Sequence, residues 1–242
     1  MIYREFGQTG KQLSVLGFGG LRFPSDLYRT EAGRERCAEL VIEAWENGIN
    51  YFDTAPDYCG SKCEQIYGAA FRHMNDFYVS TKSTINEDPK ADDVRRRIEK
   101  SLNIMGLEKI DFYHMWCILD IEQYRRIIAP GGPYWGALKA KEEGLISHIC
   151  FSAHCTGSEI AEIVNEGYFE GVTLGYNVIN SRFRDEGVRC AKEKGIGVIT
   201  MNPLAGGFIP KNEDRFAFIC ENERESVCEA ALRYNASTPG IN

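Results

Sequence analysis

The sequence predicts an α/β fold, a (β/α)8 barrel of the TIM type. Short runs of β-branched and aromatic residues alternate with longer amphipathic stretches, which is typical of repeated strand-then-helix units. Polar residues recur where successive runs end. Because consecutive parallel strands share a direction, these residues should converge on one face of the barrel, where this fold holds its chemistry.

Seven strands are predicted from the β-branched and aromatic runs. In chain order they are Val15–Gly19, Asn50–Asp53, Phe77–Thr81, Ile110–Met115, His148–Ser152, Val172–Tyr176 and Gly197–Met201.

The amphipathic stretches between and after these strands predict helices, and several end at a glycine that suits a left-handed C-cap. The predicted helices are Glu31–Asn47, Ser61–Phe71, Ala91–Met105, Tyr134–Glu143, Ser158–Asn165, Phe183–Lys194 and one near Glu225–Tyr234. The capping glycines are Gly48, Gly106, Gly144, Gly167 and Gly195.

A small hairpin is predicted before the first strand. Ile2–Phe6 and Lys11–Ser14 flank the turn sequence Gly7-Gln-Thr-Gly10. In a barrel this hairpin would lie across the bottom, opposite the active site. No linker rich in proline, serine or charge divides the chain, so we expect residues 1–242 to form a single domain.

The end of the sequence is unusual for this fold. Eight strand-helix units need one more strand and helix after Ser226–Tyr234, yet the sequence stops at Ser237–Asn242. We therefore expect a barrel truncated after its seventh strand and helix, as in a fragment of a longer protein. The edges of the first and seventh strands would then be unpaired, which is unfavourable unless something covers them.

Composition favours small-molecule chemistry over polymer binding. The 242 residues are 43% hydrophobic and carry a net charge of −7. No cluster of lysine and arginine is present, which argues against a nucleic-acid surface. The first residues lack the apolar core of a signal peptide, and no apolar run is long enough to cross a bilayer. We expect a cytoplasmic protein that uses neither a membrane nor a nucleic acid.

Nine cysteines raise the question of a metal site or of disulfides. Only Cys59 and Cys63 lie close together in the sequence, and no Cys-x-x-Cys pair occurs. The odd number and the absent signal peptide favour reduced thiols, several of them packed as small apolar groups. No structural metal site is predicted.

Four polar residues near the ends of three successive strands form the candidate catalytic group: Asp53, Tyr58, Lys82 and His114. A tyrosine is a poor acid near neutrality because its ordinary pKa is about 10. A lysine ammonium would stabilise the phenolate, and a carboxylate would fix the lysine. A histidine would hydrogen-bond a substrate carbonyl oxygen. This group suits reduction of an aldehyde or ketone by hydride from a cofactor.

Two alternatives stay open. Lys82 could form a Schiff base with a carbonyl substrate while Tyr58 shuttles protons, as in a barrel lyase. Alternatively, the chain could be a non-catalytic fragment that keeps the four residues but cannot hold a cofactor, because the eighth unit is missing.

Several segments, in the same order along nearly the whole chain, resemble the aldo-keto reductase superfamily. They are Tyr3–Gly10, Leu16–Gly20, Gly48–Tyr58, Ser80–Lys82, Ser101–Leu107, Asp111–His114, Glu143–Ser147 and Asn202–Gly207. The resemblance implies an eight-stranded barrel with Tyr58 as the general acid. Lys82 and Asp53 would tune that tyrosine, and His114 would orient the carbonyl group.

The resemblance also implies a nicotinamide cofactor, NADP(H), with NAD(H) kept open because the family's contacts to the adenosine 2′-phosphate lie mainly after strand eight. Gly17-Phe-Gly-Gly20 does not complete a dinucleotide-binding fingerprint, since Arg22 occupies the final glycine position. The segments Phe151–His154 and Met201–Gly207 resemble bacterial members that often carry an iron–sulfur-binding C-terminal extension. We expect no iron–sulfur cluster in this chain.

The implied cofactor contacts are partly changed in this sequence. Of the residues that hold the nicotinamide amide, Ser152 is present, whereas Ala153 and Thr173 stand in place of an asparagine and a glutamine. His154 or Asn177 is a candidate replacement, and Met201 stands where an aromatic ring usually covers the nicotinamide. The loop from Pro203 to Lys211 would wrap the pyrophosphate. The predicted cofactor-binding residues are Ser152, Asn177, Met201, Pro203, Leu204, Gly206 and Lys211.

The implied partner is a small-molecule carbonyl compound whose identity depends on the loops above the barrel. Trp116, Tyr134 and Trp135 are candidates for an apolar substrate pocket, although aromatic residues at a barrel rim are as often packing residues.

Overall fold

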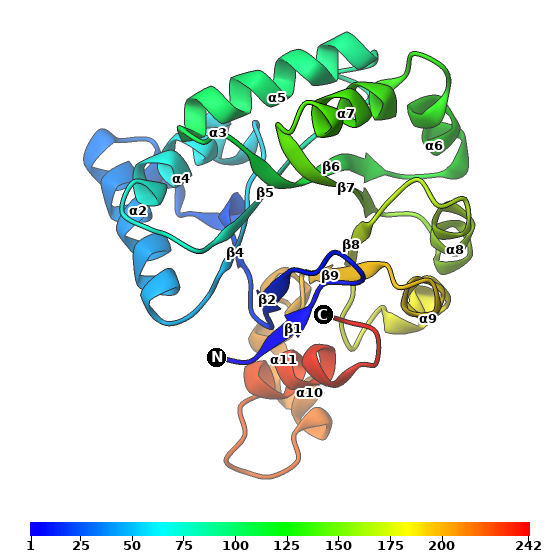
Figure 1. Ribbon diagram of the computed structural model, residues 1–242. Coiled ribbons are helices and arrows are strands. Elements are labelled where there is room, and N and C mark those ends of the chain that lie inside the picture. Colours follow the sequence, from blue (N-terminus) through cyan, green and yellow to red (C-terminus); the bar gives the residue numbers. More distant parts are fainter.

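The computed structural model describes all 242 residues. Its main sheet has seven parallel strands in sequence order and curls into a partial barrel with the helices outside (Figure 1). The predicted fold class is confirmed, with seven of the eight strands of a TIM-type barrel present. The strands are β3 (Phe18–Gly19), β4 (Tyr51–Asp53), β5 (Tyr78–Ser83), β6 (Ile110–Ile118), β7 (Ile146–Ala153), β8 (Gly171–Gly175) and β9 (Gly197–Met201).

The helices follow the predicted order. The α-helices are α1 (Ser25–Tyr28), α2 (Glu31–Glu46), α3 (Tyr58–Ser61), α4 (Cys63–Phe71), α5 (Ala91–Met105), α6 (Ile121–Ile128), α7 (Pro133–Glu142), α8 (Gly157–Asn165), α9 (Asp185–Glu193), α10 (Glu213–Phe216) and α11 (Val227–Ser237). Short 3-10 turns lie at Gly20–Arg22, Ser181–Phe183, Ala205–Gly207, Pro210–Asn212 and Ala217–Ile219.

The short helices α1, α3 and α10 were not predicted, β6 and β7 run beyond their predicted bounds, and two further differences have a local physical reason. Helix α6 was not predicted, because its eight residues contain too few turns for a helical repeat of apolar residues to be recognised. Its start is nevertheless capped by Asp120, which accepts a hydrogen bond from the backbone N–H of Gln123. Strand β3 keeps only Phe18–Gly19 of the predicted Val15–Gly19. The reason is that β3 is an edge strand that pairs with β4 alone, over two residues.

Helix α5 shows why the helices form where the pattern placed them. Val94, Ile98, Leu102 and Met105 recur along one face and are all buried against the sheet. The helix ends at Gly106, whose φ of 68° is the left-handed conformation that glycine adopts without strain.

An N-terminal hairpin closes the bottom of the barrel. Strands β1 (Tyr3–Glu5) and β2 (Gln12–Ser14) pair antiparallel, and Phe6 beside them is completely buried. The Phe6 ring packs edge-on against Phe112, with 5.0 Å between the ring centroids. A Cβ atom at Gly171 or Gly197 would lie 2.5 or 2.4 Å from the same ring, so those strands approach it only because they carry glycine there.

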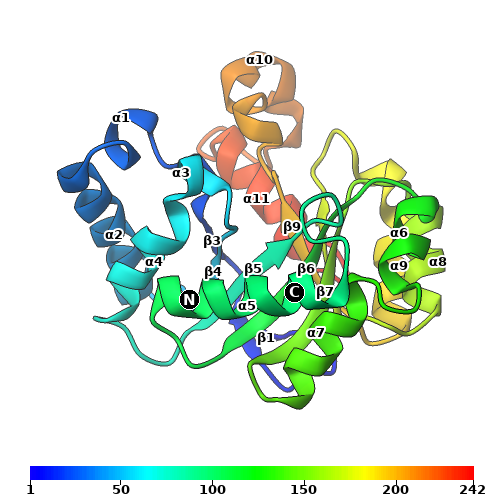
Figure 2. The ribbon, with the colours of Figure 1, turned by 90° about the horizontal axis from the view of Figure 1, so that it is seen from above.

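The hairpin and the functional loops lie at opposite ends of the barrel. Figure 2 shows β1 at one end and α1, α3 and α10 at the other. None of the helices combines the length and the apolar composition that a bilayer-spanning helix needs.

Strand register brings one set of side chains to the inside of the barrel. Phe112 faces inward against Phe6, so His114, two residues further along β6, faces inward too. Lys82 pairs directly with His114 across β5 and β6. The same alternation turns Asp53 inward, because Asp53 pairs with Ser80, which lies two residues before Lys82 on β5.

The two ends of the chain meet at the edge of β9. The backbone N–H of Asn242 donates to the carbonyl oxygen of Val198 at 3.0 Å, and the Asn242 side chain accepts from the Val198 N–H at 2.7 Å. The Asn242 amide also donates to the carbonyl oxygen of Glu5 at 2.6 Å. These contacts cover one point of the edge that no strand of this chain pairs with.

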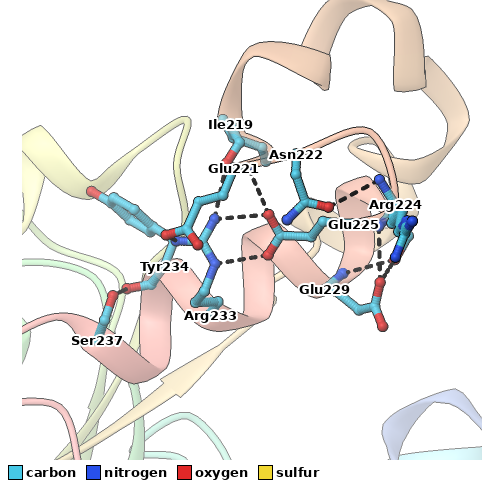
Figure 3. Close-up of polar contacts among 10 residues, drawn as sticks. Ile219, Glu221, Asn222, Arg224, Glu225, Glu229, Arg233, Tyr234 and Ser237 are labelled. Carbon is cyan, nitrogen blue, oxygen red and sulfur yellow. Dashed lines mark hydrogen bonds and ion pairs between the residues drawn. The ribbon is translucent and has the colours of Figure 1, made fainter.

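A charged network fixes the loop that returns from α10 to α11 (Figure 3). The Arg233 guanidinium donates to both carboxylate oxygens of Glu225, at 2.7 and 3.1 Å, and to the carbonyl oxygen of Ile219 at 3.1 Å. Ser226 and Glu229 form a capping box at the start of α11. A bidentate contact of this kind orders a loop more effectively than a single exposed ion pair.

Replacing Phe6 with alanine should lower the free energy of unfolding by about 3–5 kcal/mol, because it leaves a cavity where the buried ring packs at the bottom of the barrel. Phe218→Ala is the matched control, since that ring is 79% exposed, and it should change stability by less than about 0.5 kcal/mol. Urea unfolding of both variants measures the difference. Equal costs would show that Phe6 does not hold the hairpin to the barrel.

Candidate active site

Asp53, Lys82 and Tyr58 are in direct contact at the carboxyl ends of the strands. The Lys82 ammonium donates to both Asp53 carboxylate oxygens, at 2.8 and 2.7 Å, and to the Tyr58 hydroxyl oxygen at 3.2 Å. The ammonium also lies 4.9 Å from the centre of the Tyr58 ring. The structure thus brings together three of the four predicted catalytic residues, while their roles stay predictions.

A chain of buried hydroxyl groups supports Asp53 from below. The Ser80 hydroxyl donates to Asp53 at 2.6 Å, and the Tyr51 hydroxyl lies 2.8 Å from the Ser80 oxygen. Because the single proton of Ser80 goes to the carboxylate, Tyr51 is the donor in the second hydrogen bond. The carboxylate is therefore held by Lys82 on one side and by this chain on the other.

Electrostatics keep both Lys82 and Tyr58 protonated at neutral pH. Burial lowers the pKa of Lys82, but attraction from Asp53 and Tyr58 more than offsets it, so this pKa lies above its ordinary value. Burial raises the pKa of Tyr58, and the Lys82 ammonium opposes only part of that rise. Tyr58 is therefore a phenol with a proton to give, next to a permanent positive charge.

The Tyr58 ring is positioned by an aromatic partner and by an unusual turn. Trp116 packs edge-on against it, with 5.6 Å between the ring centroids. Trp116 reaches this position because β6 bulges just after it, where Cys117 has a φ of 63° and the pairing with β7 shifts. On the other side, Tyr58 begins a turn whose next three residues all have positive φ.

His114 lies in the same space but is bonded to a neighbouring strand. Its Nε2 atom is 3.0 Å from the hydroxyl oxygen of Thr173 on β8. Burial, and then the positive charge of Lys82, lower the pKa of His114 to about 3, so the ring is neutral at physiological pH. Thr173 stands where the resemblance implies a glutamine, and the structure gives it the different task of holding the histidine.

The residues predicted to hold the nicotinamide end lie along the inner face. Ser152 is buried on β7 and pairs in register with Thr173. Met201 is half-buried at the end of β9, opposite Gly175. His154, by contrast, is exposed.

Asn177 is buried just after β8, and its side chain forms hydrogen bonds to the backbone of nearby loops. Its amide donates to the Asn202 carbonyl oxygen at 3.0 Å, and its side-chain oxygen accepts from the backbone N–H groups of Ile179 and Asn180. The sequence did not predict this structural role. A contact between Asn177 and a cofactor stays a prediction.

A cavity of about 360 Å³ lies beside Asn177. Its lining includes Arg22, Asn202 and Gly206, so residues from after β3, β8 and β9 meet there. The backbone of Asn202 and that of Gly206 are left-handed, with φ of 58° and 66°. A Cβ atom on Gly206 would lie 3.3 Å from the Arg22 guanidinium, so this charge lies directly beside the glycine backbone at the cavity.

The remaining loop residues predicted for the cofactor are not all at this cavity. Pro203 and Leu204 are half-buried, and Leu204 packs against the small apolar cluster around Ile209. Lys211 is exposed in a separate hollow that also contains Glu213 and Asp214. The structure therefore does not bring Lys211 to Gly206, and the positive charge at the cavity comes from Arg22.

Sequence reasoning missed the supporting residues more than the central ones. Ser80 was detectable, because the alternation of a strand turns it to the same side as Lys82. Arg22 breaks a glycine motif in the sequence, and that motif gives no sign that its guanidinium lines a cavity. The contact of Thr173 with His114 joins two strands that are not neighbours in the sheet, and no local pattern indicates it.

Comparisons with known proteins identify the family. The profile described as the Aldo/keto reductase family matches residues 15–240. L-galactose dehydrogenase of Arabidopsis thaliana is 27% identical over 242 aligned residues, which cover 96% of this chain and 74% of that protein. This chain belongs to the aldo/keto reductase family.

Solved structures of other aldo/keto reductases share its fold. A thermostable aldo-keto reductase in complex with the inhibitor epalrestat matches with a TM-score of 0.82 at 21% identity, covering 100% of this chain and 87% of that one. An aldo-keto reductase from Klebsiella pneumoniae in complex with NADPH matches with a TM-score of 0.81 at 17% identity, covering 99% and 82%. At these identities the likeness shows the fold alone. Membership of the family makes this chain an oxidoreductase-type enzyme.

The hydroxyl chain gives a stability prediction. Ser80→Ala should cost about 1–3 kcal/mol of unfolding free energy, because it leaves the Tyr51 hydroxyl buried without its partner. Tyr51→Phe should cost less, since Ser80 still donates to Asp53. The double variant should cost less than the sum of the two single variants, as coupled partners do. Additive costs in urea unfolding would show that the two hydroxyls act independently.

Proposed function

We propose that this protein reduces an aldehyde or ketone to the alcohol with a nicotinamide cofactor, with Tyr58 as the proton donor. One observation carries the proposal: a buried ammonium, Lys82, contacts both the Asp53 carboxylate and the Tyr58 hydroxyl. This arrangement supplies a proton and stabilises the anion left behind, which is what carbonyl reduction needs from a protein.

The cofactor we propose is NADP(H), with NAD(H) as the alternative. When bound, a nicotinamide cofactor supplies the hydride, which no side chain provides. The chain fits such a group: the cavity beside Arg22 combines a guanidinium, side-chain amides and a glycine backbone, a set that suits a phosphate. Ser152 and Met201 on the inner face would hold the nicotinamide end. The Klebsiella pneumoniae relative in complex with NADPH supports the choice.

In the proposed reaction each central residue has one task. Tyr58 donates its proton to the oxygen of the carbonyl group as negative charge develops there. Lys82 stabilises the resulting phenolate, which lies 3.2 Å from the ammonium. Asp53 keeps Lys82 charged and in place, and Ser80 keeps Asp53 in place.

His114 acts as a neutral hydrogen-bonding group in this proposal. A ring with a pKa of about 3 carries no positive charge at pH 7, so its contribution to the developing oxyanion is a hydrogen bond alone. Thr173 fixes the plane of the ring through Nε2. Because this contact fixes the ring, it also fixes the direction from which His114 can hydrogen-bond the carbonyl group.

The lyase alternative is less well supported by the geometry. A Schiff base forms from a neutral amine, which a lysine reaches when its pKa is lowered. Lys82 instead has a raised pKa and is held by two carboxylate oxygens. Borohydride with a carbonyl compound should therefore trap no covalent adduct on Lys82, as mass spectrometry of the treated protein would show.

We also propose that residues 1–242 form a single domain, because one continuous sheet runs from β3 to β9. A single cooperative unfolding transition is the expected result.

Tyr58→Phe should reduce the rate of NADPH-dependent carbonyl reduction by about 10²–10⁴-fold while leaving the cofactor dissociation constant unchanged, because it removes the proton and little volume. Tyr3→Phe is the matched control, since that hydroxyl lies at the opposite end of the barrel on the Gly48 carbonyl oxygen. Neither His114 nor Tyr58 should give the wild-type rate a pH dependence between about pH 5 and 8, because His114 stays neutral and Tyr58 stays protonated across that range. Full turnover in Tyr58→Phe would exclude Tyr58 as the acid.

Arg22→Ala should weaken NADPH binding by about tenfold or more, because it removes the positive charge at the cavity. Lys211→Ala is the matched control and should change affinity less than about twofold, since Lys211 lies in a separate hollow beside acidic residues. Titration of NADPH against tryptophan fluorescence measures both constants. A chain that binds no NADPH or NADH at all would support the non-catalytic alternative.

A further inference from the structure

The turn that carries Tyr58 is a strained segment of the active site. Cys59, Gly60 and Ser61 have φ values of 55°, 60° and 63°, so three consecutive residues are left-handed. Outside glycine, this conformation costs about 1–2 kcal/mol per residue. Such a turn persists only when contacts around it hold it in place.

Two thiols add side-chain contacts to the backbone hydrogen bonds of this turn, and they share one acceptor. The sulfur atoms of Cys59 and Cys63 lie 3.2 and 3.5 Å from the carbonyl oxygen of Gly20, which follows β3. Both side chains are buried, with 6% of Cys59 and none of Cys63 exposed. A Cβ atom on Gly20 would lie 2.3 Å from the Cys63 sulfur, so the thiols fit there only because residue 20 is glycine.

The two thiols differ in their readiness to ionise. When Cys59 ionises, the single proton of Cys63 donates to the Cys59 sulfur instead of to the Gly20 carbonyl oxygen. This hydrogen bond is the main reason that the pKa of Cys59 falls to about 7, with a smaller contribution from the backbone N–H of Phe23. Burial raises the pKa of the Cys63 thiol well above its ordinary value. At neutral pH the pair therefore offers a partly ionised sulfur next to a protonated one, and the thiolate is the form that reacts with oxidants.

We propose that Cys59 and Cys63 form a peroxide-sensitive dithiol that closes to a disulfide and displaces Tyr58 from Lys82. First, the Cys59 thiolate attacks hydrogen peroxide: an S–O bond forms, the O–O bond breaks and hydroxide leaves, which gives a sulfenic acid. Next, the Cys63 sulfur attacks Cys59: an S–S bond forms, the S–O bond breaks, and the departing hydroxide takes the Cys63 proton as water. Two thiols are oxidised by two electrons, one peroxide becomes two waters, and a dithiol reductant reverses the change.

Burial selects the class of oxidant. Cys59 exposes 6% of its surface, while Gly60 and Ser61 beside it are exposed. A molecule close to the size of water reaches such a sulfur more readily than a bulky thiol reagent does. Hydrogen peroxide is therefore the expected oxidant.

Disulfide formation removes both thiol contacts between the turn and Gly20. Sulfur atoms joined at about 2 Å carry no proton, so neither can donate to Gly20. The peptide group of Tyr58 belongs to the same turn, since its carbonyl oxygen accepts from the Lys62 N–H at 3.2 Å. The turn then relaxes and carries the Tyr58 hydroxyl away from the ammonium. The effect on carbonyl reduction rests on the proposed function, whereas the disulfide itself does not.

Peptide mapping of the whole protein after hydrogen peroxide treatment tests the disulfide directly. Trypsin cleaves after Lys62, so a Cys59–Cys63 bond joins peptide 37–62 to peptide 63–72 until dithiothreitol separates them. Peptide 37–62 also holds Cys37, which makes Cys37→Ser the matched control. The linked peptides should form in wild type and in Cys37→Ser, and should be absent from Cys59→Ser and from Cys63→Ser. No linked peptides in wild type, or linked peptides that persist in Cys59→Ser, would overturn the proposal.

Displacement of Tyr58 is read in two ways. Carbonyl reduction by the oxidised wild type should fall roughly tenfold or more and recover with dithiothreitol, while Cys63→Ser should keep its rate under the same treatment. Fluorescence of Trp116, which packs against Tyr58, should change with the same time course whether or not the protein is active. A disulfide that alters neither signal would overturn the coupling to Tyr58. A protein that forms the disulfide and shifts its fluorescence, but never reduces a carbonyl compound, would refute the proposed function alone.

Discussion

The contact between Lys82 and Asp53 is the interaction on which the active site depends. An ammonium that is only 3% exposed would lose most of its hydration and tend to release its proton. Asp53 prevents this by presenting both oxygens within 2.8 Å, and Ser80 and Tyr51 hold the carboxylate in turn. A buried ion pair of this kind adds little net stability. Its value is that it fixes a positive charge next to the Tyr58 hydroxyl.

The sheet imposes the second constraint. Seven strands curl around the inner face without pairing β9 to β3, so the interior depends on packing at the bottom and on loops at the top. The hairpin closes the bottom through Phe6. At the top, Trp116 and the turn after Tyr58 define the space over Lys82.

The sequence was most informative where one strand end determines one position. Asp53 and Lys82 end or nearly end their strands, and His114 pairs in register with Lys82, so parallel strands bring these residues together whatever the loops do. Helix α6 and the short β3 were harder, because a helix of eight residues and a two-residue edge pairing leave almost no periodic signal. The cavity was hardest: whether Arg22 or Lys211 supplies its charge depends on how a glycine-rich loop turns, which only the backbone angles show.

Phe6, Gly171 and Gly197 also constrain how this chain can change in evolution. One ring occupies the space that two Cβ atoms would need, although the glycines lie far from it in the sequence. A methyl group gained at either glycine is tolerated only if the side chain at position 6 becomes smaller, and a smaller side chain at position 6 removes the clash with Phe6 at both glycines. These three positions therefore share one volume, and substitutions at them should be correlated among related sequences rather than independent.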